Sequence, residues 1–157
     1  MAWLEGSPLG HVMRSSGVWT YGIVNLIHIL GVSALFGSVL MLDLRLLGAW
    51  RTVPLVTVAG TTVPIARLGF AVAATSGAGL LATKATEYVG NPFLLIKFAA
   101  IAIALINVMV IAQLPGWKAR AVRDPSDRER RQLAIAGGVS LLSWLTAVAA
   151  GRMIGYW

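Results

Sequence analysis

Four long runs of apolar residues alternate with polar or charged segments along the chain. The runs cover residues 18–42, 68–89, 93–114 and 133–155. Each is longer than the ~20 apolar residues that a helix needs to cross the hydrocarbon core of a bilayer. The pattern predicts an all-α fold and a single domain over residues 1–157, in which four transmembrane helices form an antiparallel bundle.

Helix-breaking and capping residues mark several boundaries between these runs. Asn91-Pro92 predicts the start of the third helix, and Pro115-Gly116 predicts its end. Ser126 or Asp127 predicts the N-cap of the helix that leads into the fourth run. Because only a few residues separate the second run from the third, these two helices are expected to form a hairpin.

Two further segments are too short or too polar to cross a membrane. Residues 2–15 mix apolar side chains with Glu5, His11 and Arg14, which predicts a short N-terminal helix in the membrane interface. Residues 53–63 are rich in β-branched side chains, and we expect a loop or hairpin there. A role for this loop in binding a partner is the alternative.

The composition supports a membrane location and excludes several classes of function. Hydrophobic residues make up 57% of the chain and charged residues 12%, whereas soluble domains hold about 25% charged residues. The net charge is +7, but the basic residues cluster in one loop without a nucleic-acid-binding motif, so the expected partner is the lipid bilayer and not a nucleic acid. The absence of cysteine excludes disulfides and iron–sulfur clusters, and two histidines are too few for a zinc site, so no metal site is predicted.

The distribution of lysine and arginine predicts which side of the membrane each loop faces. Nine of the 13 basic residues lie in segments 43–67 and 115–132, and the other four lie near the opposite ends of the helices. Lysine and arginine are enriched in cytoplasmic loops. We therefore expect both segments in the cytoplasm and both termini outside it, in the periplasm.

His28 is the one histidine inside an apolar run, and it is the main candidate for a functional residue. It lies roughly 15 Å below the outer end of the first helix, close to the middle of a bilayer. Polar residues at similar estimated depths predict one layer around it, which contains Asn25, Thr75, Ser76, Asn107, Ser143 and Thr146. Simple hydrogen bonding between helices, a haem ligand, a proton relay and a contact to a small ligand are the alternatives for His28.

The remaining charged residues of the runs lie near the helix ends, where ion pairs lower the cost of burial. At the inner end, Asp43 and Arg45 are expected to form a local or interhelical pair. At the outer end, pairing or a pocket for an anionic headgroup or quinone-like ligand is expected among Lys84, Glu87, Lys97 and Arg152. Small residues that predict close helix packing are Ser33, Gly37, Gly77, Gly79, Gly137, Gly138 and Gly151.

Several phrases of the sequence together resemble a known family. They include Trp19-x-Tyr21, Ile27-His28-Ile29-Leu30-Gly31, Asp43-Leu44-Arg45-Leu46-Leu47-Gly48, Tyr88-x-x-Asn91-Pro92 and Gly151-Arg152-x-x-x-Tyr156. The sequence resembles an uncharacterised family of small bacterial four-helix inner-membrane proteins, and more distantly copper-resistance D-type membrane domains and b-type cytochrome bundles. The resemblance implies a bacterial inner-membrane protein with His28, Asp43, Arg45, Lys97 and Arg152 at recurring positions. The more distant resemblance implies haem or copper, although the chain lacks the several core histidines of multi-haem members.

Three functional hypotheses follow from these observations. The runs contain no nucleophile–base pair, carboxylate pair or metal cluster, which favours a non-enzymatic accessory or anchoring subunit of a membrane complex, bound to a membrane-protein partner or to copies of itself. The first alternative is a redox or haem-binding subunit in which His28 binds haem b. The second is a transporter for a small solute or metal, with a polar path through Asn25, His28, Asn107 and Thr146.

Overall fold

The computed structural model describes residues 1–15, 17–83 and 85–156, and these residues are helical apart from short connections. The four long helices are α3 (Gly17–Leu47), α4 (Leu55–Thr83), α5 (Pro92–Gln113) and α7 (Asp127–Met153). The short ones are α1 (Ala2–Glu5), α2 (Pro8–Ser15), α6 (Pro115–Lys118) and the 3-10 helix η1 (Ile154–Tyr156). All four long helices are long and apolar enough to cross a membrane, as expected of a multi-pass membrane protein.

The predicted starts of the third and fourth long helices are confirmed by their caps. The Asn91 side chain accepts a hydrogen bond from the Phe93 amide at 2.9 Å, and Pro92 occupies the first turn of α5. At α7 the cap is Ser126, which forms a reciprocal capping box with Glu129. Both caps satisfy amide groups that have no partner within the helix.

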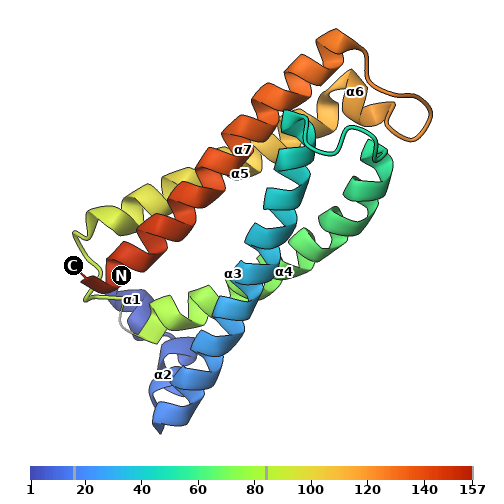
Figure 1. The fold of residues 1–157 in the computed structure, drawn as a ribbon. Coiled ribbons are helices and arrows are strands. Elements are labelled where there is room, and N and C mark those ends of the chain that lie inside the picture. The colour runs from blue at the N-terminus through green and yellow to red at the C-terminus, as the bar shows by residue number, and fades with distance from the viewer. Residues whose placement is uncertain (16, 84, 157) are drawn as a thin grey trace.

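The predicted loop over residues 43–67 is wrong, because most of it is helical. α3 continues to Leu47 and α4 begins at Leu55, so the connection between them covers only residues 48–54. Residues 55–63 belong to α4, and within it the hydroxyls of Thr61 and Thr62 donate to the carbonyls four residues earlier. Pro64 lies inside α4, where an interior proline favours a bend, and Figure 1 shows α4 as a curved helix.

The long helices form two packed pairs that meet through one contact surface. α3 packs along α4, α5 packs along α7, and α3 also packs on α7. Within the described residues, α4 and α5 form no extensive contact of their own. Figure 1 shows the two pairs converging near the 48–54 turn and diverging towards the termini. This arrangement is more open than the closed antiparallel bundle that the sequence predicts.

The hydrophobic core lies in the convergent half of the molecule. One buried cluster, called the inner core cluster below, draws on all four long helices and consists of Leu46, Leu55, Ile111, Leu133 and Ala136. A second cluster contains Leu35, Ala104 and Trp144, with the ring of Phe70 meeting Trp144 edge to face at 6.2 Å. The helices are therefore fixed to one another mainly at this end.

The N-terminal segment forms two short helices instead of the single one that is predicted for residues 2–15. α2 lies against the end of α4, since a Cβ added at Gly10 would lie 3.0 Å from the Ala82 carbonyl oxygen. Glu5 accepts hydrogen bonds from the amide and hydroxyl of Thr86 at 2.9 and 2.6 Å. These contacts attach the segment to α4 and to the turn that follows it.

Candidate functional site

His28 lies on the side of α3 that faces α4. Its Nδ1 atom is 2.9 Å from the carbonyl oxygen of Ala73 and 3.1 Å from the hydroxyl oxygen of Ser76. The ring also packs on Gly77, where an added Cβ would lie 3.0 Å from the His28 Cε1 atom. The glycine therefore makes room for the imidazole beside α4.

The contact with Ala73 indicates the tautomer of a neutral His28 ring. A backbone carbonyl can only accept a hydrogen bond, so Nδ1 carries the proton and Nε2 carries the lone pair. Nε2 has no hydrogen-bond partner among the described residues. His28 thus presents an unoccupied acceptor nitrogen in the half of the molecule where the helix pairs diverge.

Lys97 is a charged residue that acts on this site from the other helix pair. It comes from α5, is half-buried, and lies over Gly151 of α7, where an added Cβ would be 3.4 Å from its Nζ atom. It is also close enough to His28 to act on it electrostatically. In the part of the chain that the structure describes, the Lys97 ammonium has no ion-pair or hydrogen-bond partner. His28 and Lys97 are therefore two incompletely partnered polar groups, one from each helix pair.

The other residues of the predicted polar layer do not gather around His28. Asn25 and Thr146 are exposed on the outside of the chain. Asn107 is buried, and its amide donates to the Ala136 carbonyl in the inner core cluster at 2.9 Å. Ser143 is also buried and donates to the Val139 carbonyl of its own helix.

The predicted polar layer does not form around His28 for a geometric reason. Leu46, which packs with Ala136, follows His28 by a length of helix that corresponds to about 27 Å. Counting residues from each helix end assumes that the helices stand side by side at equal tilt, whereas the pairs diverge. Of the predicted layer, only Ser76 contacts His28, and the polar path proposed for a transporter is not formed by Asn25, His28, Asn107 and Thr146.

Asp43 and Arg45 also have separate environments. Asp43 is 1% exposed, and its Oδ2 atom has no hydrogen-bond partner among the described residues. It lies beside Ser140 of α7. Arg45 points to the 48–54 turn, where its Nε donates to the Val53 carbonyl at 2.9 Å. The predicted ion pair between Asp43 and Arg45 is therefore absent from the described residues.

Arg152 and Glu87 of the predicted outer charge cluster are both exposed. Arg152 is exposed, donates to the Tyr156 hydroxyl, and stacks its guanidinium 4.8 Å from the centre of the Tyr156 ring. Glu87 is exposed on the turn that follows α4. Lys84 lies outside the described residues, so its predicted pair with Glu87 stays a prediction.

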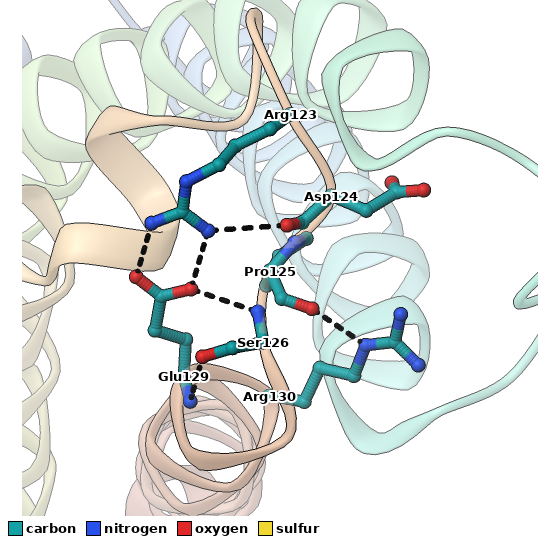
Figure 2. A network of polar contacts seen from close by, with 6 residues as sticks. All are labelled: Arg123, Asp124, Pro125, Ser126, Glu129 and Arg130. Atoms are coloured by element: carbon teal, nitrogen blue, oxygen red, sulfur yellow. Dashed lines mark hydrogen bonds and ion pairs between the residues drawn. The ribbon is translucent and has the colours of Figure 1, made fainter.

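A compact polar network closes the loop before α7, as Figure 2 shows. The guanidinium of Arg123 binds the carboxylate of Glu129 through two contacts of 2.7 Å. Glu129 also accepts from the Ser126 amide at 2.8 Å. The hydrogen bond to Glu129 and the charge of its carboxylate raise the pKa of Arg123 above its ordinary value. One carboxylate thus fixes the helix start and the loop together.

We expect Glu129→Ala to release this loop, because the change removes both the ion pair and the acceptor of the capping box. Limited trypsin digestion should cleave the purified Glu129→Ala protein within residues 119–126 several-fold faster than it cleaves the wild type there. Glu129→Gln is the matched control, since glutamine keeps a carbonyl acceptor for the Ser126 amide and loses only the charge. Equal cleavage rates in Glu129→Ala and the wild type would contradict the role assigned to Glu129.

Comparison with known proteins supports the family resemblance seen in the sequence. Residues 1–157 match the model of a family of unknown function. The chain belongs to DUF6644. No curated protein and no solved structure matches it. The distant likeness to copper-resistance D-type domains and b-type cytochrome bundles is therefore not shown, and it stays a prediction.

Some polar residues of the helix contacts were not predicted from the sequence. Ser38 and Ser140 are buried between helices, and Trp144 is buried with an indole Nε1 that has no partner among the described residues. Serine and tryptophan are common on membrane helices in any orientation. Only the helical spacing of Ser140 and Trp144 with Ala136 and Ala147 on α7 could have assigned these two residues to the same buried face.

Proposed function

We propose that this member of DUF6644 is a non-enzymatic accessory or anchoring subunit of a membrane complex, with both termini in the periplasm. The observation that carries the proposal is the Lys97 ammonium, which is half-buried and without a counter-ion among the described residues. It lies about 8 Å along α5 from Pro92. A cation at such a depth is expensive unless it is paired, and intramembrane charges often mark functional contacts.

The arrangement of the helices leaves room for a partner to supply the missing charge. α4 and α5 lack an extensive mutual contact within the described residues, and both carry exposed apolar side chains along their length. We infer that a transmembrane helix of another protein packs here and places an Asp or Glu carboxylate near Lys97. Such a pair would remove the cost of leaving the ammonium unpaired.

Native purification tests this proposal directly. The tagged protein is extracted from its own membranes in mild detergent and analysed by blue native electrophoresis and mass spectrometry. We expect an assembly larger than one chain in the wild type and in Lys97→Arg, and loss of that assembly in Lys97→Met. Lys118→Met is the matched control, because Lys118 lies on α6, beyond the opposite end of α5, where it bonds to Gln113.

Two results would overturn the subunit proposal. One is migration of the wild-type protein as a single chain after extraction from native membranes. The other is an assembly that Lys97→Met leaves intact, because lipid or water at the interface would then solvate the ammonium. A homo-oligomer would be recognised by a mass that is a multiple of the chain mass, and it would replace the second protein as the partner.

A haem-binding subunit is the second candidate, and the His28 tautomer favours it. An imidazole that donates from Nδ1 to a carbonyl presents Nε2 to a metal, which is the usual arrangement of metal-bound histidine. His28 is the one histidine within the long helices, so it would supply a single axial ligand. Bound haem would add the capacity for electron transfer or gas binding.

For the haem candidate, we expect a Soret absorption band in protein expressed with supplied haem, and loss of that band in His28→Ala. His11→Ala should leave the spectrum unchanged, because His11 is exposed on α2. The spectra are recorded in oxidised and dithionite-reduced states. A wild-type protein without a Soret band in either state would eliminate this candidate.

A further inference from the structure

A pocket of about 310 Å³ lies at the convergent end of the molecule, next to the 48–54 turn. Its walls come from the end of α3, the turn itself, the loop before α7 and the first turns of α7. Leu46, Leu55 and Leu133 of the inner core cluster form its apolar floor. Four arginines line the pocket: Arg45, Arg51, Arg130 and Arg131.

Two of these arginines are held in position by backbone carbonyls. The Nε atom of Arg45 donates to Val53, and the Nε atom of Arg130 donates to Pro125, each at 2.9 Å. Figure 2 shows the second of these bonds. Because each bond uses Nε, the terminal nitrogens of both guanidinium groups stay available as donors.

Arg51 lies beside the backbone of the turn. Gly48 has φ +110°, and an added Cβ there would lie 2.9 Å from a terminal nitrogen of Arg51. The left-handed backbone favours a glycine at this position. Arg51 is thus a third arginine that lines the pocket.

The charges of the pocket are not balanced by contacts within the chain. Arg45 lies within electrostatic range of the Asp124 carboxylate and of the guanidinium groups of Arg130 and Arg51. Asp124 and Asp127 line the same pocket, but no pocket arginine forms a salt bridge within the described residues. Four arginines and two aspartates leave an excess of positive charge, so a bound anion would relieve the repulsion between the guanidinium groups.

The position of the pocket along α3 matches the level of lipid headgroups. Trp19 and Arg45 are separated by about 39 Å of helix rise, or about 37 Å at an average tilt of 20°. The hydrocarbon core is about 30 Å thick. With Trp19 at one interface, Arg45 therefore reaches the polar region on the other side.

We propose that this pocket is a binding site for a phosphate ester, recognised by Arg45, Arg51 and Arg130. Guanidinium groups bind phosphate oxygens through paired hydrogen bonds, and their planar donors suit this geometry better than lysine does. The volume is at the lower end of the range for small-ligand sites and accommodates one phosphate with part of its headgroup. The phosphate belongs to an anionic phospholipid or to a soluble phosphate ester, and the inference does not depend on the proposed subunit role.

Native mass spectrometry and thermal unfolding of the detergent-purified full chain test the site. The probes are phosphatidylglycerol, cardiolipin, phosphatidylcholine, and glycerol 3-phosphate as the soluble ester. We expect stabilisation and retained adducts with the anionic lipids or with glycerol 3-phosphate, and a weaker effect with phosphatidylcholine. Binding of anionic lipids alone identifies a headgroup site, whereas binding of glycerol 3-phosphate alone identifies a soluble ligand, and either result supports the proposal.

The double variant Arg45→Gln/Arg130→Gln should weaken binding of the preferred probe by about tenfold or more, because it removes two charged donors. Arg67→Gln/Arg128→Gln is the matched control, since it removes the same charge from two exposed residues outside the pocket. If the first pair misfolds, Arg51→Gln removes a pocket charge without breaking any hydrogen bond of the described chain. Equal losses in the pocket and control variants, no loss in either, or binding without preference for an anionic probe would overturn the proposal.

Discussion

Replacing Gly69 by alanine is expected to destabilise the protein by about 1–3 kcal/mol, because the change forces two helix backbones apart. Gly69 of α4 faces α3 so closely that an added Cβ would lie 2.5 Å from the Leu35 amide nitrogen and 2.9 Å from the Gly31 carbonyl oxygen. Backbone atoms cannot yield as a flexible side chain does. The α3–α4 pair, which holds His28 against Ser76, would have to separate.

Thermal unfolding in detergent, followed by circular dichroism, measures this effect. A loss of this size should lower the Tm of Gly69→Ala by several degrees. Gly37→Ala is the matched control, because Gly37 lies on α3 and an added Cβ there meets nothing within 4 Å. Alanine has the higher helix propensity, so the control should be neutral or slightly stabilised. A Tm for Gly69→Ala equal to that of the control would contradict the close approach of α3 and α4.

Gly37 and Gly69 show why the packing of the helices was harder to predict than the helices themselves. The sequence favoured Ser33 and Gly37 as a packing face, yet both are exposed, and the close approach is between Gly31 and Gly69. A four-residue spacing of small residues identifies a face along which a helix can be approached. It does not identify which face has a neighbour, because that depends on contacts between residues far apart in the sequence.

Helix boundaries could be predicted where the local chemistry of the chain determines them. Asn91 and Ser126 accept hydrogen bonds from amides a few residues away, so their roles depend on short segments alone. The start of α4 is different, since β-branched residues and Pro64 favour a loop in water. Within a membrane, backbone groups must bond internally, and this requirement favours a helix over those local preferences.

The sequence predicted only those features of the candidate site that depend on the depth of a residue along its own helix. His28 was selected as a polar residue inside an apolar run, and Ser76 is one of its partners. Asn107 was assigned to the same layer, but it bonds to Ala136 at the convergent end. The divergence of the helix pairs separates these residues, and no pattern within one helix encodes that angle. Likewise, the arginine pocket combines residues from two distant stretches of the chain, 45–55 and 124–134, that only the fold brings together.

Single-cysteine labelling should show an almost complete difference between the two ends of the molecule. The sequence contains no cysteine, so each variant carries one reactive thiol. Val122 in the loop before α7 is 90% exposed, and Val89 in the turn before α5 is 61% exposed. In spheroplasts, a membrane-impermeant maleimide should label Val89→Cys, whereas Val122→Cys should react only after the membrane is permeabilised.

The expected result follows from the charges at the two ends of the helices. With Arg67 assigned to α4, eight lysines and arginines still belong to the end that carries the 48–54 turn and the loop before α7, against four at the other end. Because cytoplasmic segments carry an excess of lysine and arginine, we expect the first end in the cytoplasm. The reverse labelling pattern would overturn the orientation, and labelling of both variants before permeabilisation would contradict the placement of these two segments on opposite sides. The phosphate pocket would lie on the cytoplasmic side only if Val122→Cys is protected.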